Sequence, residues 1–146
     1  MRVEDLKVGL IVNIKRQVTN IDGDYDLVDD VRELTLDDFV FFQQNRWNDT
    51  DFDEFVHPVP ITNDVLALSG FEFVEGFTAK MWYINKELHC YLVEYPEDIP
   101  LACGTYRAHF RKNGLEECVL EINYIHELQV LMKLYGIERK IILPKQ

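Results

Sequence analysis

Apolar residues in the first third of the chain occur in short runs that resemble β-strands. Leu10-Ile11-Val12-Asn13-Ile14 follows a turn at Lys7-Val8-Gly9 and is rich in β-branched residues, which favour strands. A turn at Asp22-Gly23 separates this run from further short apolar runs at 25–28 and 31–34. The pattern therefore predicts a small antiparallel sheet.

Residues 36–45 fit two different structures. Phe39-Val40-Phe41-Phe42 is a continuous apolar and aromatic run, which favours a strand. Thr35 and Asp38 have the spacing of a helix start, so a helix over 36–45 is the alternative. We favour the strand, and we expect the polar segment 45–54 to form a loop that holds Trp47 and Phe52.

The second half of the chain predicts a helix followed by a second run of strands. His57-Pro58-Val59-Pro60 favours an extended segment, because a residue that precedes proline is disfavoured in the α region. A helix is expected near 62–69, with Thr62 as its N-cap and Gly70 at its end. Strands are then expected at 71–74, 80–84, 88–94, 105–110 and 118–122, with turns at 75–76, 85–86, 96–100 and Asn113-Gly114.

The clearest helical pattern lies near the end of the sequence. Apolar residues recur at helical spacing between 125 and 135, with Asn123 placed to cap the helix and Gly136 to end it. Residues 141–143 are expected to return to a sheet edge. We predict an α+β fold with mostly antiparallel strands, a short helix near 62–69 and a C-terminal helix near 123–135. It is expected to be a single domain, 1–146, with lobes at 1–56 and 57–146.

The acidic residues are concentrated in one half of the sequence. Of the 146 residues, 26 are acidic and 15 are basic, and the formal net charge is -11. Residues 1–64 hold 15 acidic and 6 basic residues (net -9), whereas 65–146 hold 11 and 9 (net -2). This balance argues against direct binding of nucleic acid, which requires a basic footprint. A basic protein partner fits the charge better.

Several other protein classes are disfavoured. No apolar stretch approaches the length of about 18 residues that a membrane helix needs. The opening residues lack a secretory signal pattern, and the three cysteines show no C-x-x-C spacing, so we expect a cytoplasmic protein without a disulfide framework or zinc knuckle. Glycine-rich phosphate loops are absent, no catalytic motif stands out, and no cofactor is predicted.

One acidic segment resembles a calcium loop. Its carboxylates match positions 1, 3, 5, 9 and 12 of an EF-hand, namely Asp22, Asp24, Asp26, Asp30 and Glu33. Leu27 occupies the position where an EF-hand needs glycine, and the flanking residues favour strands. We therefore predict no metal site, and keep these five residues only as weak candidates.

We favour a protein-binding role for these acidic residues over a calcium site. Acidic residues interleaved with exposed aromatic residues are typical of an interface with a cationic protein. His126 and Gln129 share a face of the predicted C-terminal helix and are further contact candidates. The predicted partner-binding residues are Asp22, Asp24, Asp26, Asp29, Asp30, Trp47, Phe52, His126 and Gln129.

Three segments resemble one family. These are Leu6-Lys7-Val8-Gly9, Pro58-Val59-Pro60-Ile61-Thr62 with Leu66 and Gly70-Phe71, and Ile122-Asn123-Tyr124-Ile125-His126-Glu127-Leu128-Gln129 with Leu131, Leu134 and Gly136. They are similar to the P-I-P-I/L-T-x-x-x-L-x-x-x-G-F and I-x-Y-V-H-x-L-Q segments of short proteins encoded in phages and mobile elements of gut Bacteroidales. Val130 stands where that family usually has asparagine. The resemblance implies a small α+β protein of phage or prophage origin, and implies no particular activity.

These observations together favour a non-catalytic phage or prophage accessory protein that binds a protein partner through its acidic N-terminal surface. A sharper form of this hypothesis is an acidic mimic of nucleic acid that occupies the basic cleft of a host protein. Two further hypotheses are an enzyme of unrecognised class and a structural part of the phage particle.

Overall fold

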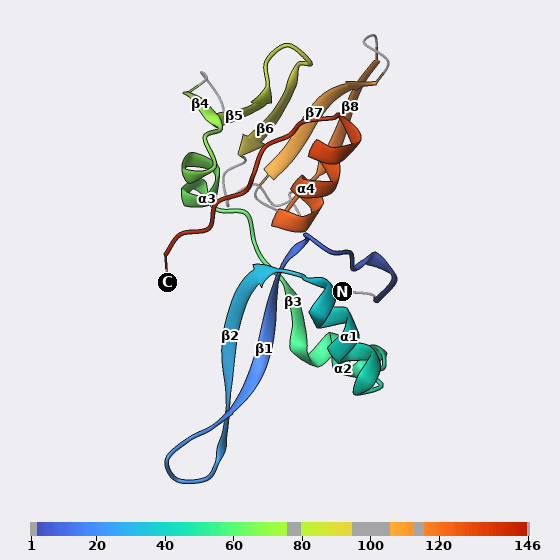
Figure 1. The fold of residues 1–146 in the computed structure, drawn as a ribbon. Helices are drawn as coiled ribbons and strands as arrows, with labels where there is room; N and C mark the ends of the chain where they lie inside the picture. The colour runs from blue at the N-terminus through green and yellow to red at the C-terminus, as the bar shows by residue number, and fades with distance from the viewer. Residues whose placement is uncertain (1–2, 76–79, 95–105, 113–115, 146) are drawn as a thin grey trace. The chain divides into compact units, whose positions relative to one another are not determined.

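A computed structural model describes residues 3–75, 80–94, 106–112 and 116–145 (Figure 1). The chain divides into two compact units, unit 1 (Met1–Val59) and unit 2 (Pro60–Gln146). The boundary lies close to the one between the expected lobes, 1–56 and 57–146. Each unit combines an antiparallel sheet with helices, which confirms the predicted α+β fold.

The sheet of unit 1 has three antiparallel strands in the order β2-β1-β3. The strands are β1 (Ile11–Thr19), β2 (Tyr25–Glu33) and β3 (Val56–Pro58), preceded by a short 3-10 helix at Val3–Asp5. The runs predicted separately at 25–28 and 31–34 form one continuous strand, β2. It pairs with β1 along its whole length, from Ile11 opposite Glu33 to Thr19 opposite Tyr25.

The strand predicted around Phe39–Phe42 is wrong, and the helix considered beside it is confirmed. This segment is helix α1 (Leu36–Gln44). The backbone N–H of Asp38 donates to Thr35 Oγ1, and the backbone N–H of Thr35 donates to the Asp38 carboxylate, so the two residues form a capping box. Phe39 and Phe42 are three positions apart and therefore share the helix face that packs on the core.

The loop predicted over 45–54 is also wrong, because it contains helix α2 (Asp49–Phe55). Asn48 and Asp51 form a second capping box, in which each side chain accepts the backbone N–H of the other residue. Two of the acidic residues of this segment, Asp49 and Asp51, lie in the first turn of α2, where negative charge is favourable. The many acidic residues of the segment favour a loop prediction only if the N-cap residue Asn48 is not taken into account.

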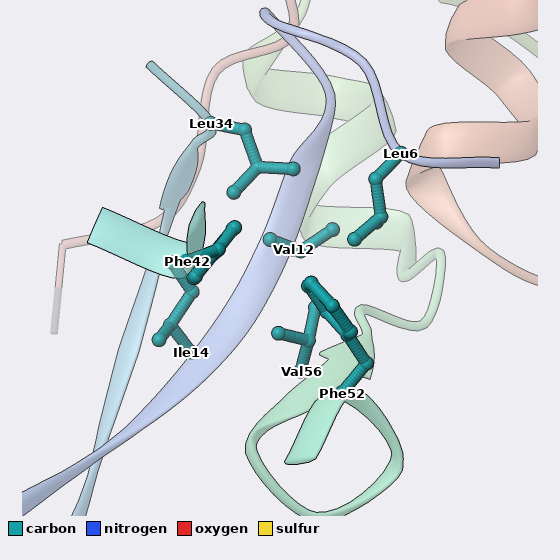
Figure 2. Packing of buried hydrophobic residues seen from close by; sticks show 7 residues of the cluster. All are labelled: Leu6, Val12, Ile14, Leu34, Phe42, Phe52 and Val56. Carbon is teal, nitrogen blue, oxygen red and sulfur yellow. The ribbon is translucent and has the colours of Figure 1, made fainter. Parts of the chain in front are cut away.

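The core of unit 1 lies between its sheet and its two helices. Figure 2 shows Val12 of β1, Phe42 of α1, Phe52 of α2 and Val56 of β3 pointing toward one another. Phe39 and Trp47 pack against this cluster from the outside. The full set of buried cluster residues is Leu6, Val12, Ile14, Leu34, Phe42, Phe52 and Val56.

Unit 2 contains a five-stranded antiparallel meander in the order β4-β5-β6-β7-β8. The bounds are β4 (Glu72–Glu75), β5 (Lys80–Asn85), β6 (Cys90–Glu94), β7 (Tyr106–Lys112) and β8 (Glu116–Glu121). All five strands lie near their predicted positions. The turns predicted at 96–100 and at Asn113-Gly114 lie outside the described residues.

Two helices complete unit 2, α3 (Asn63–Leu68) and α4 (Ile125–Leu134). Thr62 caps α3 and Gly70 follows it with a positive φ of 80°, both as predicted. Asn123 does not cap α4, because its N-cap is Tyr124 and no side chain there bonds the first turn. Instead the backbone N–H of Asn123 donates to the Glu127 side chain, at 2.9 Å.

The expected sheet edge at 141–143 is wrong. These residues form no strand, and the backbone N–H of Ile142 donates instead to Ser69 Oγ, at 2.8 Å. Arg139 donates to the carbonyl oxygens of Ser69 and Gly70, so the segment is tied to the end of α3. No helix within the described residues is long and apolar enough to cross a membrane.

Candidate functional site

Strands β1 and β2 continue beyond the core of unit 1 as a two-stranded ribbon, which we call the hairpin arm and define as residues 16–29 (Figure 1). Every residue of the arm except Asn20 is exposed. A two-stranded hairpin buries little apolar surface of its own, so the arm contributes little to the stability of the unit. Its side chains are available for contacts with another molecule.

The arm presents apolar side chains on both faces. Val18 and Val28 lie on the face that carries Ile14, and Tyr25 and Leu27 lie on the opposite face, because successive strand residues alternate. Ile21 in the loop is fully exposed, and Tyr25 is 73% exposed. A group of exposed apolar residues surrounded by charge is typical of an interaction site.

The loop at the end of the arm is ordered by one side chain. Asn20 Oδ1 accepts the backbone N–H groups of Asp22 and Asp24, each at 3.0 Å. The backbone N–H of Asn20 donates to the carbonyl of Asp24 at 2.8 Å, and Gly23 adopts a φ of 85°. This arrangement holds Ile21 at the loop surface between the strands.

The five aspartates predicted to bind a partner fall into two groups. Asp22, Asp24 and Asp26 are exposed on the arm. Asp29 accepts hydrogen bonds from Lys15 and Asn13, and these bonds lower its pKa. Asp30 accepts from Arg32 Nε at 2.9 Å, with Arg16 Nε 3.4 Å away. Only the first group therefore combines exposure with carboxylates that no basic side chain engages among the described residues.

A chain of alternating charges joins the arm to helix α1. Arg16, Asp30 and Arg32 follow one another along the face of the hairpin that carries Ile14. Arg32 donates two hydrogen bonds to Asp38, each with a donor–acceptor distance of 2.6 Å. This bidentate pair lowers the pKa of Asp38 to about 2, against the effect of partial burial, and raises the pKa of Arg32.

Beside this chain of charges lies a groove with a volume of about 560 Å³. This volume is typical of sites that hold a small ligand or a few side chains. One wall comes from the base of the hairpin and the other from the two helices. Its lining residues are Ile14, Lys15, Arg16, Gln17, Arg32, Asp37, Asp38, Phe41, Phe42, Trp47 and Phe55.

The aromatic wall of the groove is built by the turn that ends α1. Arg46 adopts a positive φ of 51°, and the backbone N–H of Trp47 donates to the carbonyl of Phe42 at 3.0 Å. This pattern is a Schellman motif, and it returns the chain so that the Trp47 and Phe42 rings stack with centroids 4.7 Å apart. Phe41 and Phe55 contact the Trp47 ring with centroids at 5.8 and 5.5 Å.

The remaining predicted contact residues occupy different positions. Trp47 is half-buried and lines the groove. The expectation that Phe52 contacts a partner is wrong. This residue is only 4% exposed and belongs to the core cluster, so its role is structural. His126 and Gln129 are half-buried on α4 of unit 2, where the His126 ring stacks on Tyr124 with centroids 5.8 Å apart.

The EF-hand pattern does not correspond to a calcium loop in the structure. Its residues lie on a β-hairpin, with Asp26 and Asp30 on one face of β2 and Glu33 on the other. The bidentate glutamate that closes an EF-hand would therefore point away from the other carboxylates. In the part of the chain that the structure describes, no group of three or more histidine, cysteine, aspartate or glutamate residues is arranged to hold a metal ion.

Sequence reasoning missed Arg16, Arg32 and Phe41 as residues of the groove, whereas Phe55 was considered with Trp47 and Phe52 as an aromatic residue of a possible interface. The Thr35-to-Asp38 spacing was the available signal, because a helix that starts there places Phe41 and Phe42 near its C-terminal end, close in sequence to Trp47. Comparison with protein-family models, with curated proteins and with solved structures finds no match to this chain.

Proposed function

We propose that this chain is a non-catalytic phage or prophage accessory protein whose unit 1 binds a protein partner through the hairpin arm. One observation carries the proposal. The arm extends beyond the core with Ile21 fully exposed and Tyr25 73% exposed, next to three exposed aspartates. Burying such apolar side chains against a partner supplies binding free energy, and the aspartates favour a basic partner.

The charge of unit 1 supports the same type of partner. Residues 1–59 contain 14 acidic and 6 basic residues, a net charge of -8. An excess of this size accelerates association with a cationic protein and makes the association rate fall with added salt. The apolar contacts on the arm would in turn govern how slowly the complex dissociates.

Mimicry of nucleic acid is less well supported by the same surface. Such a mimic needs a row of outward carboxylates, but Asp29 and Asp30 are engaged by Lys15, Arg16 and Arg32. The exposed apolar residues of the arm also have no counterpart in a phosphate backbone. We therefore propose a protein contact that combines apolar and acidic side chains.

The direct test is site-specific photo-crosslinking in a bacterial host lysate. A photoreactive phenylalanine analogue replaces Ile21 in one variant and Leu68 in another, since both residues are exposed, one on the arm and the other on α3. We expect a specific adduct from position 21 and none from position 68. Equal adducts at both positions, or none at position 21, would overturn the proposal.

Two matched sets of substitutions then separate the apolar and acidic contributions. Ile21→Ser with Tyr25→Ser is expected to abolish the adduct formed by the analogue placed at position 27, at any salt concentration. Asp22→Asn, Asp24→Asn and Asp26→Asn are expected to weaken it mainly at low salt. Removal of the same number of charges from unit 2, by Asp64→Asn, Glu75→Gln and Glu87→Gln, serves as the control and should leave the adduct unchanged.

A further inference from the structure

The groove of unit 1 has a surplus of one negative charge when its immediate ion pairs are included. Lys15 is paired with Asp29, and Arg16 and Arg32 share Asp30 and Asp38. Asp37 also lines the groove and is exposed, and no basic side chain among the described residues engages it. The three basic side chains are thus paired with three of the four carboxylates. The fourth carboxylate, that of Asp37, is available to attract a cation from a partner.

The opposite part of the groove is apolar and accessible. Phe41 is 51% exposed although it contacts Trp47 and Phe42. Trp47 and Phe55 are half-buried beside it. Exposed aromatic rings next to a carboxylate can accept an apolar side chain and the methylene stem and charged end of an arginine or lysine.

We propose that this groove binds a basic segment of the protein partner, with an apolar side chain against Phe41, Trp47 and Phe55 and a neighbouring arginine or lysine toward Asp37. The proposal rests on the proposed function and names the chemistry of the partner. The groove lining holds three basic and two acidic side chains, and each of the basic ones is paired with a carboxylate. Charge complementarity selects a basic occupant, because Asp37 is the lining carboxylate that no basic side chain engages among the described residues and unit 1 as a whole carries net negative charge. An acidic segment would meet repulsion from Asp37 and would have to displace existing ion pairs.

The test uses the full chain and three synthetic peptides. Acetyl-Arg-Leu-Arg-Leu-Arg-amide has both features, acetyl-Arg-Ser-Arg-Ser-Arg-amide lacks the apolar anchors, and acetyl-Glu-Leu-Glu-Leu-Glu-amide has the opposite charge. The protein is labelled with fluorotryptophan and observed by fluorine NMR. The sequence contains two tryptophans, Trp47 in the groove and Trp82 buried in unit 2, so the second resonance is an internal control.

We expect the Arg-Leu peptide to shift the Trp47 resonance in a saturable way while the Trp82 resonance stays unchanged. Phe41→Ala should weaken this binding by about tenfold, and Asp37→Asn by about two- to fivefold. Val40→Ala is the matched control, because Val40 is exposed on the same helix but does not line the groove.

Two kinds of result would overturn the inference. The first is a Trp47 resonance that none of the peptides shifts. The second is an equal or stronger response to the Glu-Leu or Arg-Ser peptide. The hairpin arm is tested separately by crosslinking from position 21, so the groove can fail while partner binding by the arm stands, and the reverse outcome is equally distinguishable.

Discussion

Arg32 near the end of strand β2 grips Asp38 in the first turn of helix α1 with two parallel hydrogen bonds, from Nη1 to Oδ2 and from Nη2 to Oδ1. The same Asp38 carboxylate accepts the backbone N–H of Thr35 at 2.7 Å. The Asp38 side chain therefore completes the N-terminal cap of α1 and also connects the helix to the sheet. The pair also forms part of the groove, so the geometry of the groove depends on it.

The first prediction concerns acid stability. The folded-state pKa of Asp38, about 2, lies below its ordinary value of 3.8 because Arg32 hydrogen-bonds the ionised carboxylate. The resulting stabilisation of unit 1 is complete above about pH 4 and is lost as the pH falls through 2. After allowance for solvent screening it amounts to about 1 to 2 kcal/mol.

Asp38→Asn tests this directly by removing the charge while keeping an oxygen that can accept from Thr35. Urea unfolding between pH 2 and 7, followed by the Trp47 fluorine resonance, should show the free energy of unfolding reduced at neutral pH and nearly equal to wild type at the lowest pH. Asp37→Asn removes a charge from the same turn and is the control. An identical pH profile for Asp38→Asn and wild type would contradict the assignment.

The second prediction compares the contributions of a buried and a half-exposed phenylalanine to the stability of unit 1. Phe52 is buried in the core cluster, so Phe52→Ala should reduce the free energy of unfolding of unit 1 by about 3 to 5 kcal/mol. Phe41 is half-exposed, and Phe41→Ala should cost only about 1 kcal/mol. Chemical denaturation measures both values, and comparable losses would show that Phe41 belongs to the core instead of the groove.

The third prediction concerns the turn that positions Trp47. Arg46 adopts a left-handed conformation, which glycine tolerates better than any residue with a Cβ atom. Arg46→Gly should therefore stabilise unit 1 by about 0.5 to 1 kcal/mol, whereas Arg46→Val should destabilise it. Thermal unfolding of wild type and the two variants measures the change in stability. A loss of stability in Arg46→Gly would contradict the view that the left-handed conformation is unfavourable for arginine.

The fourth prediction concerns Cys90 in unit 2, which is fully buried. Burial raises the pKa of its thiol to about 11 from an ordinary value of 9.0. At pH 8 its thiolate fraction is then about 100-fold lower than that of an unperturbed thiol. Peptide mass spectrometry after iodoacetamide treatment should find Cys90 alkylated in urea but not in buffer, and rapid labelling of the native protein would contradict its burial.

The sequence predicts the elements of unit 2 better than those of unit 1, for a physical reason. In the sequence, the apolar runs of unit 2 alternate with clear turn signals. Its helices are followed by Gly70 and Gly136, whose positive φ angles are a local property. In unit 1, the run Phe39–Phe42 satisfies the preference for a strand and also places two rings on one helical face. The capping box decides between them, and it lies outside the apolar run.

The groove was harder to predict because it depends on register and on a turn. Lys15 pairs with Asp29 because a five-residue connection, 20–24, joins the two strands. A slip of one residue would place Asp30 opposite Lys15 and turn each carboxylate to the other face of the sheet. The approach of Trp47 to Phe42 likewise depends on the left-handed conformation of Arg46. A glycine at position 46 would have made this conformation predictable from the sequence, but arginine does not.

Strand β2 is also an edge strand, and its acidic side chains have a consequence for the behaviour of the protein at high concentration. The open edges of two molecules could otherwise join into a longer sheet, particularly along an arm with so many apolar side chains. Asp26, Asp29, Asp30 and Glu33 place like charges on the facing edges of both molecules, against a single Arg32 on each. Asp26, which is also expected to attract a basic partner, therefore acts together with the other acidic residues of the strand to prevent edge-to-edge aggregation.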